Sequence, residues 1–159
     1  MRTTIIAVLL VFVPAVRAQK SPTLAETVSW MHNFADDRGS GANFSSSGCS
    51  GVVTWYKTAS KTADNVYLTF SFSFKDLDPN SVHSVHTIIS PPADRNMWRA
   101  TATTTNNEKK VDVLNHNTQQ HEQDDVIEGI PFYSSDDATR FAKALRRAVT
   151  LCGGKSSTF

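Results

Sequence analysis

Cysteine, glycine and proline are scarce in this chain of 159 residues, which has two, seven and six of them. So few glycines and prolines exclude a collagen-like or low-complexity sequence. Charge of one sign is also lacking, because 16 basic residues face 15 acidic ones. A near-neutral chain attracts phosphates weakly, so we expect no nucleic acid among its partners. The nine phenylalanines, three tryptophans and three tyrosines, in contrast, suffice for the core of one globular domain.

Motifs that mark nucleotide and zinc chemistry are missing as well. The chain has no Gly-x-Gly-x-x-Gly, no Walker loop and no His-Glu-x-x-His. The first two patterns build a phosphate cradle, and the third supplies metal ligands. We therefore expect no cofactor.

The first 18 residues have the pattern of a signal peptide. A positive charge at Arg2 precedes an apolar run over 5–13, which is too short to span a bilayer. The segment ends at Ala18 with small or modest side chains at the positions that signal peptidase recognises. We expect cleavage after Ala18, which leaves one exported domain over 19–159 without a transmembrane segment. The alternative is an uncleaved anchor.

The predicted export affects how the two cysteines, Cys49 and Cys152, are interpreted, because it places them in an oxidising compartment. Neither belongs to a C-x-x-C pair, and the chain has no third thiol. In an oxidising compartment this favours one long-range disulfide. Closing a loop of about 100 residues stabilises a fold by about 4–5 kcal/mol in the chain-entropy model. Two free, buried thiols are the alternative.

Helix signals stand at both ends of the exported chain. Thr23 and Glu26 have the spacing of a capping box, and Gly39 suits a left-handed helix end. Near the C-terminus, Ser134 or Ser135 caps a second helix that stops at Gly153-Gly154. The second helix carries an apolar stripe at steps of three and four, formed by Ala138, Phe141, Ala142, Leu145, Ala148, Val149 and Cys152. We interpret the basic residues Arg140, Lys143, Arg146 and Arg147 as a solvated face that complements the helix dipole, with an anion site as the alternative.

Between these helices the chain alternates with period two. Phenylalanines at 70, 72 and 74 point one way along the clearest strand, and polar residues point the other. The segment 39–51 is predicted as a loop or a frayed sheet edge, and the segment 115–125 as a hydrated loop. The predicted strands are 52–57, 65–75, 82–89, 97–103, 110–115 and 125–133. The fold class is therefore α+β: an N-terminal helix, about six short antiparallel strands in a curled sheet or small barrel, and a C-terminal amphipathic helix packed on it.

Two resemblances follow from this order. Strands followed by a long terminal helix look like the pleckstrin-homology-like architecture. The segments at 23–31, 74–79 and 141–155, which include Thr-Leu-Ala-Glu-Thr-Val-Ser-Trp-Met and Phe-Lys-Asp-Leu-Asp-Pro, resemble small exported bacterial proteins of unassigned function. The second likeness implies a periplasmic or secreted bacterial protein. Neither implies an activity, because a fold does not fix a function.

Residues with catalytic potential are few. The weak candidates for metal ligands are His116, His121, Glu122 and Asp124. Their spacing matches no pattern that would fix a coordination geometry, so the segment is interpreted first as a hydrated loop. Cys49 could act as a nucleophile only beside an imidazole, and nothing in the sequence selects one of the five histidines.

The sequence thus predicts an exported, monomeric, non-catalytic binding module for a peptide, a protein partner or a small ligand. Its expected docking surface is the groove between the terminal helix and the adjacent open strand edge, where a peptide could add main-chain hydrogen bonds. A metal- or cysteine-dependent hydrolase of the cell envelope is the alternative. A purely structural envelope protein is the third possibility.

Overall fold

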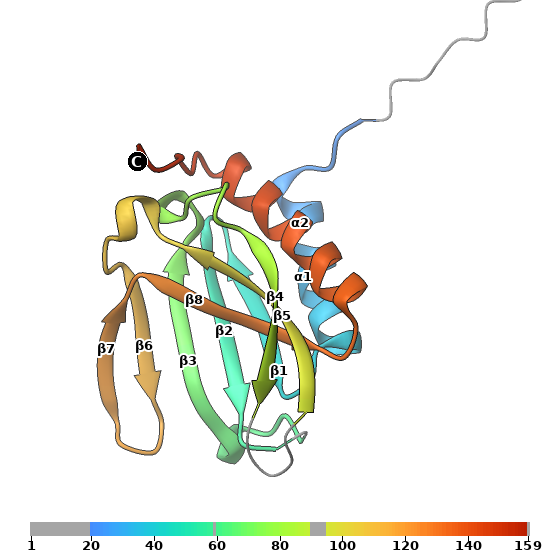
Figure 1. The fold of residues 1–159 in the computed structure, drawn as a ribbon, viewed down its shortest axis with the longest axis vertical. Coiled ribbons are helices and arrows are strands. Elements are labelled where there is room, and N and C mark those ends of the chain that lie inside the picture. Colours follow the sequence, from blue (N-terminus) through green and yellow to red (C-terminus); the bar gives the residue numbers. More distant parts are fainter. Residues whose placement is uncertain (1–19, 59, 90–94, 159) are drawn as a thin grey trace, which may run out of the picture.

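The computed structural model describes residues 20–58, 60–89 and 95–158 of the chain (Figure 1). The predicted signal peptide, residues 1–18, lies outside the described residues. A first helix, eight strands and a last helix follow one another in these ranges, so the predicted α+β class is confirmed. No helix in the same ranges is both long and apolar enough to cross a membrane.

Helix α1 (Leu24–Arg38) begins at the predicted capping box. Thr23 Oγ1 accepts the amide N–H of Glu26 at 3.3 Å, and the Glu26 carboxylate accepts the amide N–H of Thr23 at 2.7 Å. The predicted left-handed end at Gly39 is wrong, because that residue is extended, with φ −71° and ψ 136°. Glycine is required there for space instead: an added Cβ would lie 2.4 Å from the carbonyl oxygen of Ala35.

The strands form two antiparallel sheets, and neither closes on itself. The larger sheet has the order β1-β2-β3-β6-β7, and the smaller has the order β4-β5-β8. The strands of the larger sheet are β1 (Ala42–Ser47), β2 (Ser50–Tyr56), β3 (Val66–Ser73), β6 (Val111–Asn115) and β7 (Gln120–Asp124). Those of the smaller sheet are β4 (His83–Ile89), β5 (Arg95–Thr103) and β8 (Val126–Phe132). The predicted curled sheet or small barrel is therefore a pair of open sheets. Short 3₁₀ helices lie at Ala63–Asn65, Phe74–Asp76 and Thr105–Asn107.

Strand β1, an edge strand, lies in the segment predicted as a loop or a frayed edge, and β7 lies where a loop was predicted. β1 pairs with β2 across the two-residue turn Gly48-Cys49, in which Gly48 has a φ of 56°. Ala42 and Phe44 are buried on one face of β1, so the strand does have a period-two pattern. The pattern is hard to recognise in the sequence, because most other residues of the strand are small and polar. β7 is entirely polar, so it shows no alternation of hydrophobicity, and backbone pairing with β6 defines it.

Phenylalanines of β3 form the floor of the core, as predicted. Phe70 and Phe72 are buried on the inner face of the larger sheet, whereas Tyr67 on the other face is exposed. Leu145 and Val149 of the last helix belong to the same hydrophobic cluster. The predicted contact between the terminal helix and the phenylalanine-lined sheet is confirmed.

Helix α2 (Ser135–Leu151) packs on the sheets with its predicted apolar stripe buried. Ser134 is the N-cap, and its hydroxyl oxygen accepts the amide N–H of Asp136 at 3.2 Å. Gly153, with a φ of 81°, follows the helix in the left-handed conformation. Helices α1 and α2 come from opposite ends of the described chain, yet they lie side by side (Figure 1).

Candidate functional site

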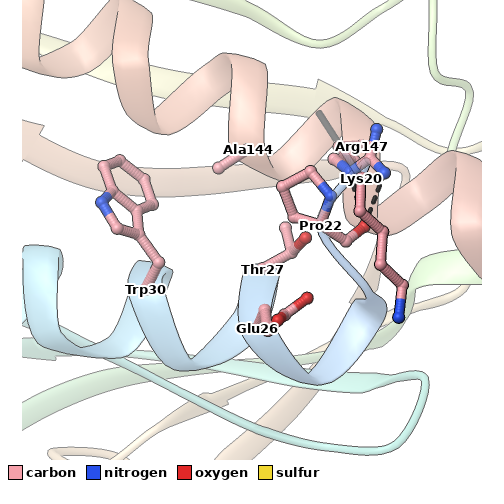
Figure 2. A pocket seen from close by; sticks show the side chains of 7 residues that line it. All are labelled: Lys20, Pro22, Glu26, Thr27, Trp30, Ala144 and Arg147. Atoms are coloured by element: carbon pink, nitrogen blue, oxygen red, sulfur yellow. Dashed lines mark hydrogen bonds between the residues drawn. The ribbon is translucent and has the colours of Figure 1, made fainter. Parts of the chain in front are cut away.

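A groove lies between α1, α2 and the residues that precede α1, with a volume of about 400 Å³ (Figure 2). We call it the interhelical groove. It is lined by Lys20, Pro22, Glu26, Thr27, Trp30, Ala144 and Arg147. One wall thus comes from α1 and the residues that precede it, and the other comes from the last helix.

The capping box shapes the first wall. It fixes the point at which α1 begins, and so the place where Pro22 meets the helix. Thr27 donates its hydroxyl to the carbonyl oxygen of Thr23 at 2.7 Å, so this buried side chain needs no polar partner in the groove. Arg147 of α2 then holds the same segment by donating from Nε to the carbonyl oxygen of Pro22 at 3.1 Å.

The charges around the groove do not cancel. Lys20 and Arg147 are cations, and Glu26 is the acidic residue among the lining residues. The Glu26 carboxylate is engaged by the backbone and side chain of Thr23, and these hydrogen bonds lower the pKa of Glu26. The Arg147 guanidinium bonds the Pro22 carbonyl through Nε and Nη2. Two cations and one carboxylate leave the lining of the groove with a net positive charge, which favours an anionic ligand.

Trp30 forms an aromatic wall of the groove. Its ring stacks on Phe34, with centroids 4.4 Å apart and an interplanar angle of 20°. The Arg140 guanidinium lies 4.9 Å from the Phe34 centroid and 5.9 Å from that of Trp30. Trp30 keeps 36% of its surface exposed. The stacked ring is thus positioned before any ligand arrives, which reduces the entropy lost on binding.

The predicted disulfide is present. Cys49 and Cys152 are bonded, with their Cα atoms 5.7 Å apart. The bond joins the turn between β1 and β2 to the C-cap of α2. Since both sulfurs are in the disulfide, neither is a thiolate nucleophile.

The weak metal-ligand candidates do not gather at one point. His121 and Glu122 are neighbours on β7, so their side chains leave opposite faces of the strand. The His121 ring contacts the Asp112 carboxylate at 3.2 Å, while the His116 ring contacts the Thr69 hydroxyl at 2.9 Å. Asp124 accepts the amide N–H groups of the two residues that follow it. In the part of the chain that the structure describes, no three His, Cys, Asp or Glu side chains are grouped to hold a metal ion.

Side chains of α2 contact the edge strand beside which the docking surface was expected and the residues that precede it. Strand β4 is the edge strand next to α2, and the Ser84 hydroxyl lies 3.1 Å from that of Thr139. Arg146 donates from Nε to the carbonyl oxygen of Pro79 at 3.0 Å and also bonds the carbonyl oxygen of Val82. The hollow lies instead between α2 and α1.

Sequence reasoning missed this site, although one signal pointed to it. Arg140, Ala144 and Arg147 recur at helical spacing on α2, on a stripe different from the buried one. We interpreted these arginines as a solvated face near the helix dipole. In the structure Arg147 binds a backbone carbonyl and Arg140 covers an aromatic ring.

Comparisons of the chain with protein-family models, curated proteins and solved structures found no match. The function must therefore be argued from the geometry and chemistry of the interhelical groove.

Proposed function

We propose that this protein is an exported, non-catalytic binding module whose interhelical groove takes a ligand with an apolar body and an anionic group. One observation carries the proposal: an exposed, pre-stacked tryptophan lines one end of a hollow whose other end holds two cations, Lys20 and Arg147 (Figure 2). Apolar surface with a few convergent polar groups is typical of ligand sites.

The size of the groove agrees with this assignment. Its volume of about 400 Å³ falls within the range of about 300–1,000 Å³ in which small-molecule sites lie. Trp30 supplies a large rigid surface, and Arg147 supplies a guanidinium partly withdrawn from water. A ligand whose anionic group pairs with Arg147 can extend its apolar body toward Trp30, because both residues line the same hollow (Figure 2).

The disulfide supports export. A bond between Cys49 and Cys152 persists in an oxidising compartment, which agrees with the signal-peptide pattern of residues 1–18. A periplasmic or secreted bacterial location and a monomeric state remain part of the proposal. The alternative of a cysteine hydrolase has lost its nucleophile, since Cys49 is oxidised. A metal-dependent hydrolase has no grouped ligands among the described residues to support it.

The test is a fluorescence titration with anilinonaphthalene sulfonate, an aromatic sulfonate that combines both ligand features. We expect saturable binding of one probe per chain. Trp30→Ala should weaken binding about 30-fold, the effect of losing an aromatic anchor worth about 2 kcal/mol. Arg147→Gln should weaken it about five-fold, the upper range for an ion pair near the surface. Lys109→Gln, which removes an exposed cation outside the groove, serves as the matched control and should change nothing.

A neutral analogue, N-phenyl-naphthylamine, separates charge from apolar contact. It should bind wild-type protein about as weakly as the sulfonate binds the Arg147 variant. Near-ultraviolet circular dichroism confirms that each variant is folded. Equal affinity of the sulfonate for wild type and the Trp30 variant would contradict the proposal.

A further inference from the structure

We infer that the occupant of the interhelical groove is an extended acidic peptide in the polyproline II conformation, with two carboxylates three residues apart. This inference rests on the proposed function and names its ligand. The carrying observation is the pair of arginines on α2: Arg140 covers the aromatic wall, and Arg147 lies at the other end of the groove.

The spacing of these arginines is set by the helix. Arg140 and Arg147 are seven residues apart, so they lie on the same face, separated along the axis by about 10 Å at 1.5 Å per residue. Ala144 lies between them and lines the groove with a single methyl group. This face of α2 therefore presents two cations, Arg140 and Arg147, with the small apolar side chain of Ala144 between them.

The aromatic wall lies at the Arg140 end of this face. Arg140 covers Phe34 and Trp30, and its ion pair with Asp137 is long, at 3.9 Å. The cations along the groove and its rim are Lys20, Arg140, Lys143 and Arg147, whereas the acids are Glu26, Asp136 and Asp137. The excess of positive charge is complementary to a partner with carboxylates.

A polyproline II peptide matches this layout. It has three residues per turn and rises 3.1 Å per residue, so residues i and i+3 point to the same side about 9 Å apart. In a β-strand the same two residues would point to opposite faces. A partner helix would be about 10 Å across, too thick for a shallow hollow of about 400 Å³. Prolines between the carboxylates would pack against Trp30, as in other aromatic-lined grooves that bind polyproline.

The chain's own leader is a poorer occupant. Its apolar run over 5–13 is joined to the groove wall at Lys20 through a segment that contains Arg17. The leader supplies basic residues and no acidic one. It would therefore add positive charge to a face that already has an excess of it.

The experiment measures fluorescence anisotropy with short labelled peptides and protein expressed from the full-length sequence. All peptides are amidated at the C-terminus, so that only side chains supply carboxylates. Glu-Pro-Pro-Glu carries the matching spacing. Glu-Pro-Glu-Pro and Pro-Glu-Glu-Pro have the same composition and charge with other spacings, and Glu-Pro-Pro-Gln has one carboxylate. We expect Glu-Pro-Pro-Glu to bind about five-fold tighter than each of the other three, the effect of one additional ion pair. Its affinity should fall as sodium chloride is added.

A mutant cycle tests the assignment of Arg140. Arg140→Gln should abolish the advantage of Glu-Pro-Pro-Glu over Glu-Pro-Pro-Gln, while Lys109→Gln should preserve it. Equal binding of the isomeric peptides would overturn the inference, since it would show only non-specific attraction. Binding of phosphatidylglycerol vesicles without any peptide binding would also overturn it and would assign the face to a membrane surface.

The titration with anilinonaphthalene sulfonate distinguishes failure of the peptide inference from failure of the proposed function. If anilinonaphthalene sulfonate binds in a Trp30-dependent manner and no peptide does, the peptide inference fails and the proposed function stands. If neither binds, both fail.

Discussion

The two long faces of α2 differ in what they contact. One face is buried: Phe141 lies 5.8 Å from the ring of Phe44 and 5.5 Å from that of Phe132, measured between centroids. The other face borders the interhelical groove, where Ala144 and Arg147 line a hollow instead of filling one. One amphipathic helix thus seals the core and builds a candidate site. Substitutions on the two faces should therefore separate stability from binding.

Removing the disulfide should lower the free energy of unfolding more than any other change, because this bond anchors the C-terminal end of α2 and therefore both of its faces. Cys49→Ser with Cys152→Ser opens a loop whose ends are 103 residues apart in sequence. In the chain-entropy model this lowers the free energy of unfolding by about 4–5 kcal/mol. Urea titration monitored by circular dichroism measures the loss. The same shift should appear when the wild type is reduced, and the double variant should not respond to reductant.

An unchanged urea midpoint in the double variant would contradict this prediction. It would show that contacts other than the disulfide are sufficient to hold the end of α2. Those contacts exist: Arg146 bonds two backbone carbonyls, and Ser157 of the following tail donates its amide N–H to Asp78 at 2.9 Å.

Two leucines, one on the buried face of α2 and one on its exposed face, test the difference in stability between the two faces. Leu145 is 3% exposed in the core, whereas Leu151 on the same helix is 44% exposed. Leu145→Ala should cost about 3 kcal/mol, because it leaves a cavity. Leu151→Ala should cost less than about 0.5 kcal/mol. Urea unfolding of both variants checks the difference, and similar losses would show that the buried face is not tightly packed.

The buried face could be predicted from the sequence because a local pattern encodes it. The alternation of β3 and the stripe of α2 each repeat within one element, and the capping box at Thr23 and the N-cap at Ser134 each span only a few residues. Such patterns are visible in the sequence because one face of each element meets the core and the other does not. Gly39 misled us, since a close approach and a left-handed turn both require glycine.

The groove face could not be predicted from the sequence, because it exists only after tertiary packing. Trp30 and Arg147 belong to helices at opposite ends of the described chain, and no local spacing relates them. β7 was missed for a related reason, since its polar residues form a strand only through pairing with β6. The disulfide was predictable because the chain has only two cysteines to pair.

Acid should produce the smallest effect, and it should act on the anchored end of α2. Asp78 is 7% exposed, and its carboxylate accepts the amide N–H groups of Asn80 at 2.7 Å and Ser157 at 2.9 Å. Burial alone would raise the pKa of Asp78, but these backbone hydrogen bonds outweigh it and leave the pKa below the ordinary value of 3.8. Because the folded pKa is the lower one, the stabilisation is fully present above about pH 4 and is lost as the pH falls through the folded pKa.

Asp78→Asn tests this by removing the charged acceptor. It should lower the free energy of unfolding at neutral pH by about 1.5 kcal/mol, the value of a hydrogen bond to a charged group. It should also flatten the fall in stability below about pH 4. Asp37→Asn, whose side chain is 73% exposed, is the matched control and should keep the wild-type pH profile. The arginines of the groove face stay charged throughout this range, so acid should weaken the anchored end while the groove keeps its positive charge. An unaltered acid profile in the Asp78 variant would show that other carboxylates govern the transition.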